Sequence, residues 1–281
     1  MGVMEPVTVA FQGERGAFSD EAVHKLLGDS VEPLPCRTFE DVFAAVVDGR
    51  VRCALIPIEN SLAGSVLRNY ELLAEEELVI RGEVYLRISH NLIARPGVRM
   101  SDVRHVHSHP VALAQCQRFI AEHMLEAVAS YDTAGAVKDL MSGGATDRAA
   151  IAGRWAAELY GGEVIAEEIE DHRENYTRFL LLSKPDEKVE VPSAGPLKTS
   201  LLFRTPNRPG ALFRALAAFA LRDVNMTKIE SRPIVGRPWE YSFYVDISGD
   251  TGDPNIVRAI DHLREMCEVV RVLGCYAAGM V

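Results

Sequence analysis

Residues 184–198 read K-P-D-E-K-V-E-V-P-S-A-G-P-L-K, with three prolines, one glycine and charges of both signs. This stretch lacks the period of a helix, and its composition is typical of a linker. A chain of 281 residues is also long enough for two domains. We therefore expect a first domain over residues 1–185, a linker over 186–197 and a second domain over 198–281.

On the N-terminal side of the linker, short apolar segments alternate with amphipathic ones. Ser19 and Thr38 are placed to cap helices, and Asp41 completes a capping box with Thr38. The segments predicted as strands are 7–11, 53–58, 91–94, 105–108 and 179–182, and further helices are predicted from Pro110, Thr133 and Ala149. Repeated strand-then-helix order predicts an α/β domain with a mainly parallel sheet, which binds ligands at the carboxyl ends of its strands.

On the C-terminal side the pattern is more compact. Strands are predicted over 199–204, 225–233, 241–247 and 268–276, and helices over 209–221 and 256–263. The resulting order βαββαβ is that of a ferredoxin-like domain. This part holds no cluster of acids and bases, so we expect it to serve regulation or assembly.

Composition narrows the class of protein. The chain has 30 Lys and Arg against 40 Asp and Glu, a net charge of −10. Binding to nucleic acid or to an anionic membrane needs a basic face, so neither is expected. The segment Met1–Pro6 lacks the features of a secretion signal, and the five cysteines are scattered. We therefore expect reduced thiols and a location in the cytoplasm.

Three predicted helices begin after short polar or glycine-rich turns, at residues 13–19, 108–110 and 132–135. The N-terminus of a helix offers free backbone N–H groups and a positive dipole end, which suit carboxylates and phosphates. Turns of this kind also occur in every α/β domain. If these three meet at one edge of the sheet, they favour a small substrate with several negative charges. The first turn lacks the G-x-G-x-x-G spacing, so no nicotinamide cofactor is expected.

Two polar segments are candidates for catalysis. Glu59-Asn60-Ser61 ends a buried strand, where the carboxylate can act as an acid, orient a donor or cap the next segment. In N-Y-T-R-F (175–179), an extended backbone places Thr177 and Phe179 on one face and Arg178 on the other. A single threonine is commonly no more than a strand former, so both interpretations stay open.

His105, His107 and His109 alternate, which would align them on one face of a strand. Such alternation can build a metal site. No cysteine or acidic ligand accompanies them in the sequence, so we favour packing or exposure and expect no metal.

Seven short segments carry a resemblance to a known family. They are F-Q-G-E-R-G-A-F-S (11–19), P-I-E-N-S-L-A-G-S (57–65), S-H-P-V-A-L-A-Q-C (108–116), D-T-A-G-A (132–136), N-Y-T-R-F (175–179), N-R-P-G-A-L (207–212) and I-E-S-R-P (229–233). In this order, the sequence resembles a monofunctional prephenate dehydratase with a C-terminal ACT domain. The likeness covers nearly the whole chain.

The resemblance implies conversion of prephenate to phenylpyruvate with loss of water and carbon dioxide, and no cofactor. It implies a two-lobed catalytic domain like a type II periplasmic binding protein, with the site in its cleft. It further implies inhibition by phenylalanine at contacts between ACT domains, and hence a homodimer or homotetramer.

Carried over residue by residue, the resemblance implies that Thr177 is essential. It adds Glu59, Asn60, Ser108 and Gln115 to the catalytic group. The implied substrate-binding residues are Gly16, Ala17, Phe18, Ser19, Asp132, Thr133, Ala134, Asn175, Arg178 and Phe179. The implied phenylalanine-binding residues are Gly210, Ala211, Leu212, Asn225, Glu230, Ser231 and Arg232.

Two alternatives remain. The same segments are close to arogenate dehydratases, whose substrate carries an ammonium group where prephenate has a side-chain ketone. A two-lobed sensor of amino acids joined to an ACT domain would need a cleft without catalytic groups, and the presence of Thr177, Glu59 and Gln115 disfavours it.

Overall fold

The computed structural model describes residues 7–192, 195–234 and 236–280. These residues form two compact units. Unit 1 holds residues 7–66 and 84–179, and unit 2 holds residues 67–83 and 180–280.

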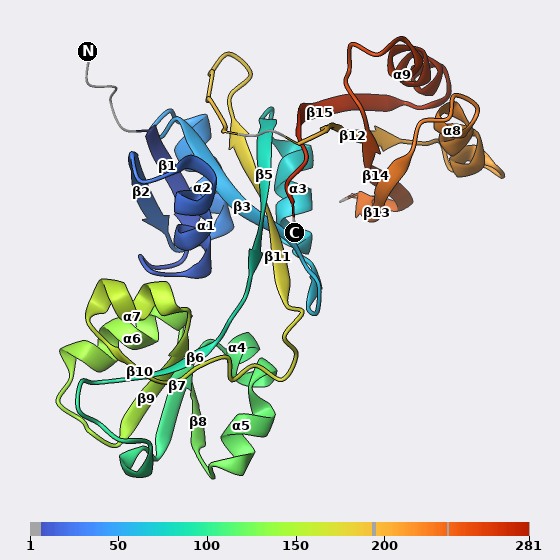
Figure 1. Cartoon of the computed structure of the whole chain (residues 1–281). Helices are drawn as coiled ribbons and strands as arrows, with labels where there is room; N and C mark the ends of the chain where they lie inside the picture. The colour runs from blue at the N-terminus through green and yellow to red at the C-terminus, as the bar shows by residue number, and fades with distance from the viewer. Residues whose placement is uncertain (1–6, 193–194, 235, 281) are drawn as a thin grey trace, which may run out of the picture. The chain divides into compact units, whose positions relative to one another are not determined.

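The first lobe of unit 1 is built on parallel strands covered by two helices (Figure 1). Its elements are β1 (Val7–Gln12), α1 (Phe18–Leu27), β2 (Val31–Cys36), α2 (Phe39–Val47), β3 (Cys53–Asn60) and β4 (Gly64–Ser65). With β5 (Val79–Arg87) and β11 (Tyr176–Ser183), the strand order is β2-β1-β3-β11-β5, and β4 pairs with β3. Fully buried apolar side chains such as Val9, Phe11 and Leu55 form the core of this lobe.

Local sequence explains most of these boundaries. The capping box predicted for Thr38 and Asp41 is confirmed at the start of α2. The cap predicted at Ser19 is wrong, because Ala17 is the N-cap of α1, two residues earlier. Strand β2 was not predicted because it contains Pro33 and Pro35. Its place at the edge of the sheet accommodates them, since an edge strand can do without some N–H donors.

The second lobe of unit 1 (residues 91–166) is a mixed sheet in the order β10-β6-β9-β7-β8. Its strands are β6 (Asn91–Ala94), β7 (His105–Ser108), β8 (Glu126–Ala129), β9 (Arg148–Ala152) and β10 (Glu163–Ala166). Its helices are the short η1 (Met100–Asp102), α4 (Pro110–Gln115), α5 (Gln117–Glu122), α6 (Thr133–Ser142) and α7 (Arg154–Tyr160). One apolar core joins α6 and α7 to the sheet, and a second joins α4 to it, so both faces are covered.

The helix predicted from Ala149 is wrong. Residues 148–152 form the central strand β9, and the helix α7 begins only at Arg154. Alanine is the best helix former, which explains the error. In the structure its small side chain suits a central strand that is packed by helices on both faces.

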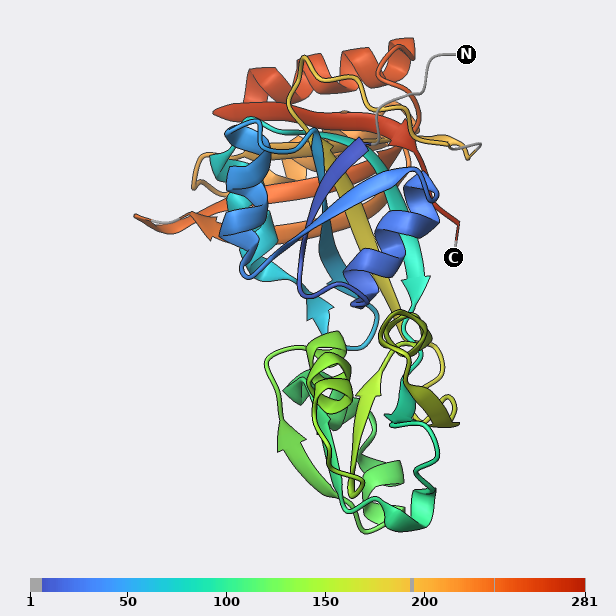
Figure 2. The same ribbon diagram turned by 90° about the vertical axis from the view of Figure 1, so that its left-hand side faces the viewer.

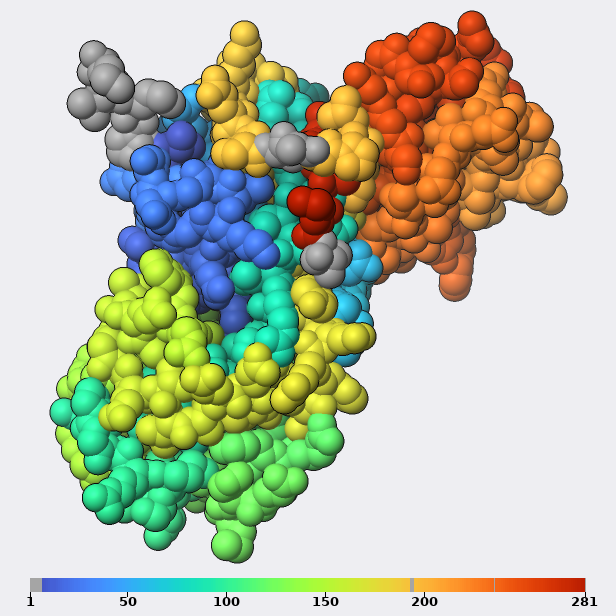
Figure 3. All heavy atoms as spheres, in the orientation of Figure 1, coloured from blue at the N-terminus to red at the C-terminus, as the bar shows by residue number. Residues whose placement is uncertain are grey.

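Two crossover segments, residues 88–90 and 167–175, connect the lobes. The turn before α1 and the helix itself add direct contacts. Tyr160 Oη donates to the Arg15 carbonyl of the turn at 2.7 Å, and Trp155 Nε1 donates to Asp20 Oδ2 of α1 at 3.2 Å. Gly16 is needed here, since its φ is +85° and a Cβ would lie 3.1 Å from the Cα of Ala156. Figure 3 shows the blue N-terminal residues in contact with the yellow-green ones.

Unit 2 contains α3 (Leu67–Glu75) and a βαββαβ domain. The domain consists of β12 (Leu197–Arg204), α8 (Ala211–Ala220), β13 (Met226–Ile234), β14 (Arg237–Ser248), α9 (Pro254–Met266) and β15 (Val269–Ala277). Its antiparallel sheet has the order β13-β14-β12-β15, which confirms the predicted ferredoxin-like topology. Together with the two-lobed α/β unit, this confirms the predicted fold class.

The two faces of this sheet have different partners. Phe203, Phe243 and Val245 pack with α8 and α9 on one face, along which the red helix α9 runs in Figure 2. On the other face, the ring of Tyr244 contacts that of Tyr70 in α3 at a centroid distance of 4.8 Å.

Within the described residues, no helix combines the length and the apolar character that crossing a membrane requires.

Asp20 gives a test of the contacts between the lobes. Its buried carboxylate accepts hydrogen bonds from the backbone N–H of Gly16 at 2.8 Å and from Trp155. Asp20→Ala leaves these buried donors unpaired, so we expect the free energy of unfolding to fall by about 2–4 kcal/mol. Asp29→Ala, at a fully exposed carboxylate, should change it by less than about 0.5 kcal/mol. Urea denaturation measures both, and equal effects would contradict this role of Asp20.

Candidate active site

A cavity of about 590 Å³ lies in unit 1, with walls from both lobes and from the crossover segment 88–90. Asn60 of β3 and Thr177 of β11 contribute from the first lobe, Gln115 of α4 from the second, and Ile88 and His90 from a crossover. Strands β3 and β11 are neighbours in the sheet, so the fold brings together at the cavity residues that lie more than 100 positions apart in the chain.

Four helices present their first turns to this cavity. Ser19 of α1, Phe39 of α2, Val111 of α4 and Thr133 of α6 all line it. Free N–H groups and positive dipole ends at these positions favour anions. Of the described lining residues, Arg37 is the one with a permanent positive charge, so most of the attraction for an anion comes from the backbone.

A chain of side-chain hydrogen bonds runs along the wall. Asn60 Nδ2 lies 2.9 Å from Thr177 Oγ1 and 2.7 Å from Asn175 Oδ1. Asn175 Nδ2 lies 3.1 Å from Gln115 Oε1, and the same oxygen lies 2.9 Å from His90 Nε2. We call these five residues the amide relay. It contains members from both lobes and from both crossover segments.

His90 is the titratable group of the relay. It is 2% exposed, and burial lowers its pKa, although the hydrogen bond to Gln115 acts in the opposite sense. Its ring meets the edge of Phe18 at a centroid distance of 5.4 Å. Its Nδ1 is buried and has no hydrogen-bond partner among the described residues.

The structure places some of the sequence-predicted site residues on the cavity wall and others behind it. Those on the wall are Thr177, Asn60, Gln115, Phe18, Ser19, Thr133 and Phe179. Asn175 is fully buried and belongs to the relay. As expected for an extended backbone, Thr177 and Phe179 share the cavity side of β11, whereas Arg178 does not line the cavity.

The remaining predicted residues have other surroundings. Ser108 is fully buried, and its hydroxyl donates to the carbonyl of Ile151 at 2.6 Å. Asp132 caps α6 by accepting from the Gly135 N–H at 2.8 Å, and burial raises its pKa. Glu59 precedes Asn60 on β3 and is half-buried. The others that do not line the cavity are Gly16, Ala17 and Ala134.

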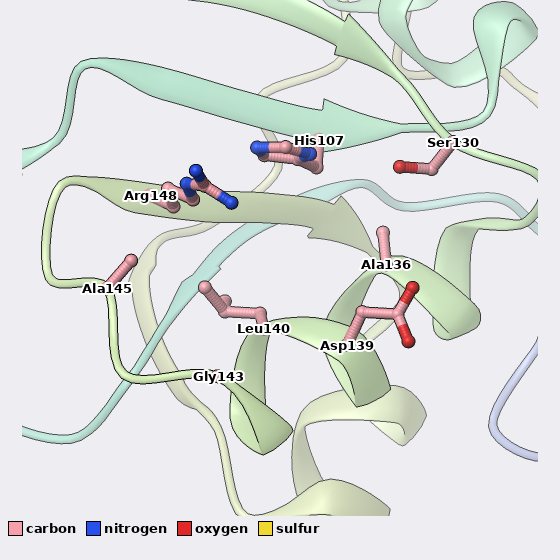
Figure 4. Close-up of a pocket in the computed structure, with 8 residues that line it drawn as sticks. All are labelled: His107, Ser130, Ala136, Asp139, Leu140, Gly143, Ala145 and Arg148. Carbon is pink, nitrogen blue, oxygen red and sulfur yellow. The ribbon is translucent and has the colours of Figure 1, made fainter.

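The three alternating histidines have separate environments. His105 lies 3.3 Å from Glu126, and His109 caps α4 and lines the main cavity. His107 lines a separate pocket of about 100 Å³ with Asp139 of α6 and Arg148 of β9 (Figure 4). No cluster of three metal-ligating side chains occurs within the described ranges.

The residues predicted to bind phenylalanine lie on two elements of unit 2. Gly210 is the N-cap of α8 with a φ of +74°, and Ala211 and Leu212 begin that helix. Glu230, Ser231 and Arg232 lie on β13, which is an edge strand, and Asn225 precedes it. Arg232 Nη2 also pairs with Glu71 Oε1 of α3 at 3.2 Å.

Sequence reasoning missed His90 and Arg37. His90 stands alone between Ser89 and Asn91, with no motif around it, so no local signal marks it. Arg37 precedes Thr38, which was predicted only as a cap. The predicted helix start at Thr38 was a usable signal, because it is of the same kind as the three turns that were singled out.

Comparison with known proteins gives two matching family models. The model described as prephenate dehydratase matches residues 9–187, and the model of the ACT domain matches residues 199–265. An arogenate dehydratase/prephenate dehydratase of Arabidopsis thaliana is 44% identical over 96% of this chain and 72% of its own length. A bifunctional N-acyl-homoserine lactone acylase/prephenate dehydratase of Komagataeibacter europaeus is 40% identical over 96% of this chain and 95% of its own.

Solved structures agree. A prephenate dehydratase from Arthrobacter aurescens, determined in complex with L-phenylalanine, is 34% identical with a TM-score of 0.86, over 96% of this chain and 90% of that one. A structure described as a quorum-quenching acylase, GqqA, is 40% identical with a TM-score of 0.87, over 96% of this chain and 98% of that one.

The lowered pKa of His90 predicts a pH dependence of stability. An unfolded histidine has a pKa of about 6.5, so between that value and the lower folded-state pKa the unfolded chain binds a proton that the folded one does not. The free energy of unfolding should therefore fall as the pH drops through this window, by up to about 1.4 kcal/mol per pH unit from this residue. Urea denaturation at pH 7.5, 6.5 and 5.5 should give a shallower decline for His90→Gln. Parallel declines would contradict the assignment.

Proposed function

The chain belongs to the prephenate dehydratase family, and we propose that the cavity of unit 1 is the site at which it converts prephenate. The reaction joins the prephenate dianion and one proton to give the phenylpyruvate anion, carbon dioxide and water. The observation that carries this assignment is the Thr177 hydroxyl, which Asn60 holds in a cavity lined by four helix N-termini.

The cavity suits a small dianion. The first turns of α1, α2, α4 and α6 supply fixed positive dipole ends for two carboxylates, and Arg37 adds one full charge. Apolar lining residues such as Phe39, Ile88 and Phe179 suit the six-membered ring between the carboxylates. A volume of about 590 Å³ is within the range of small-molecule sites.

Thr177 is oriented to donate toward the substrate. Asn60 Oδ1 accepts from the backbone N–H groups of Leu62 and Ala63, so the group that Asn60 turns to Thr177 is its NH₂. The threonine oxygen therefore accepts from Asn60, and its own proton remains for a ligand in the cavity. A hydroxyl placed in this way can donate to the ring hydroxyl of prephenate as it leaves.

Apart from positioning the dianion and assisting the leaving hydroxyl, the reaction requires little from the protein. The C–O bond to the ring hydroxyl breaks while the C–C bond to the ring carboxylate releases carbon dioxide, and the electron pair of that bond completes the aromatic ring. The departing hydroxyl takes up one proton and leaves as water. Assistance by a positioned donor is typically worth about 10²–10⁴-fold in rate.

Replacing Thr177 tests this role. Thr177→Ala removes the donor, so we expect kcat with prephenate to fall by about 100-fold or more. Thr177→Ser keeps a hydroxyl at the same position and should retain most of the activity. Phenylpyruvate formation measures both, and circular dichroism checks that the fold is unchanged. Near-normal turnover by Thr177→Ala would remove Thr177 from the mechanism.

Prephenate is the substrate that we propose, and arogenate is the alternative. The Arabidopsis relative carries both activities in its name, and a Petunia hybrida relative that is 43% identical is named arogenate dehydratase 2. Among the described lining residues, Glu40 is the one carboxylate that could attract the ammonium group of arogenate.

An assay with both substrates decides between them. The purified protein should form phenylpyruvate from prephenate with a higher kcat/KM than it forms phenylalanine from arogenate. The opposite preference would keep the mechanism and change the substrate. Turnover of neither would favour a sensor of amino acids.

Regulation by phenylalanine is proposed for the ACT domain. The Arthrobacter structure contains L-phenylalanine, which supports an effector site in this chain as well. Gly210–Leu212 lie at a helix N-terminus, which suits a carboxylate, and β13 (Met226–Ile234) is an edge strand to which a second copy of the chain could add. A homodimer or homotetramer formed through ACT domains would complete such a site.

A location in the cytoplasm is proposed from the five free cysteines, three of which are buried. The Arabidopsis relative is named as chloroplastic, so a fluorescent fusion in the source cell is the direct test.

Gly210→Ala tests the effector site without touching the cavity. At a φ of +74°, alanine is strained by roughly 1 kcal/mol, which should raise the phenylalanine concentration for half-inhibition by up to about fivefold. Gly236→Ala carries the same kind of strain, at a φ of +79° with open space around it, and serves as the control. Both variants should keep uninhibited kcat. An unchanged response of Gly210→Ala would contradict the site.

A further inference from the structure

The backbone contacts of Asn60 determine which way each amide side chain of the relay is turned. Asn60 Oδ1 lies 3.0 Å from the Leu62 nitrogen and 2.8 Å from the Ala63 nitrogen. A backbone N–H can only donate, so the atom that faces these two groups is the oxygen of the Asn60 amide. Its NH₂ group must then face Asn175 and Thr177.

The same logic passes along the relay. Asn60 Nδ2 donates, so the atom of Asn175 at 2.7 Å is its oxygen, and the NH₂ group of Asn175 faces Gln115. The atom of Gln115 that accepts from Asn175 at 3.1 Å is therefore Oε1. An amide oxygen has no proton, so His90 Nε2, at 2.9 Å from it, must carry the hydrogen.

This polarity has one consequence for His90 and one for Gln115. The proton of the neutral His90 ring lies on Nε2, and Nδ1 has none. Adding a proton to Nδ1 would bury an N–H without an acceptor among the described residues, so the neutral ring is favoured. Gln115 Oε1 is held by two donors, so the NH₂ group is the polar end that Gln115 presents to the cavity.

We propose that His90 is a positioning residue of this dehydratase, a neutral imidazole with its proton on Nε2 that holds Gln115 so that the glutamine NH₂ group donates to the bound dianion. The proposal deepens the function proposed above and rests on it. The relay thus aims two donors at the substrate, the hydroxyl of Thr177 and the amide NH₂ group of Gln115.

The position of His90 adds a reason why it is suited to this role. It lies on the crossover 88–90, whereas Asn175 lies on the crossover 167–175, and both hold a glutamine of the second lobe. The His90 backbone is itself fixed, because its N–H donates to Glu170 Oε2 at 2.9 Å and its carbonyl accepts from the Ile169 N–H at 2.9 Å. Gln115 is therefore oriented by the segments that join the lobes.

Two substitutions of His90 by amides distinguish a hydrogen bond from Nε2 to Gln115 from a role in packing alone. In His90→Gln the terminal NH₂ can occupy the place of Nε2, whereas in His90→Asn it occupies the place of Nδ1. We expect His90→Asn to lower kcat/KM for prephenate by about tenfold or more, because Gln115 loses one of the two donors on its oxygen. His90→Gln should restore most of that loss. Equal losses in the two variants, with both folded by circular dichroism, would overturn the proposal.

The tautomer can be read without any turnover. Protein labelled with ¹⁵N-histidine contains eight histidines, and comparison with His90→Gln identifies the signals of His90. Two-bond ¹H–¹⁵N correlation spectra at pH 7 should show a neutral ring with the proton on Nε2. A proton on Nδ1, or a charged ring, would overturn the proposal.

A second spectrum tests the partner. Gln115→Glu keeps an acceptor oxygen for His90 and Asn175, so the Nε2–H form should persist, while the new negative charge raises the pKa of His90. An unchanged His90 titration in this variant would mean that the two side chains are not in contact and would also overturn the proposal. Because both spectra use the resting protein, a failure of the proposed reaction would leave them readable.

Discussion

The side chain of Asn60 is the interaction on which the site depends. Its oxygen is held by the two backbone N–H groups of the turn that follows β3, and its nitrogen reaches across to β11. One amide therefore fixes the direction of the hydrogen bonds to Thr177 and to Asn175. If the amide were turned over, its oxygen would meet the Asn175 oxygen and its NH₂ would meet the N–H groups of Leu62 and Ala63, so these contacts would become repulsive.

The fold supports this amide by bringing distant segments to one place. Parallel strands of the first lobe end at the cavity, and helices of both lobes begin there. The turn before α1 and the first residues of the helix serve different purposes: Gly16 of the turn allows close contact with α7, whereas Phe18 and Ser19 of the helix face the cavity. A motif that looks like one anion-binding loop thus also fixes the position of the second lobe.

Features that depend on neighbouring residues could be predicted from the sequence, whereas contacts between distant segments could not. The strands β1, β3, β6, β7 and β11, the capping box at Thr38 and the βαββαβ domain follow from patterns within about ten residues, and they were predicted. Contacts such as Asn60 with Thr177 join positions 117 apart, and no local pattern encodes them. The resemblance to a family supplied those residues, but it gave no signal for His90. The alanine-rich strand β9 was missed because burial on both faces outweighs the helix propensity of alanine.

The cavity is built to attract a dianion mainly with helix N-termini and amide groups, and the cost of burying charged side chains explains why. A chain with a net charge of −10 could have placed several lysines or arginines in the cavity, but buried charges lose hydration, and their attraction does not always repay that cost. Helix N-termini and oriented amides supply positive potential without that loss. A neutral His90 fits the same scheme, because it adds no buried charge that would lose hydration. Dipoles of fixed direction favour the doubly charged substrate over its singly charged product, and so they favour binding at the start of the reaction and release at its end.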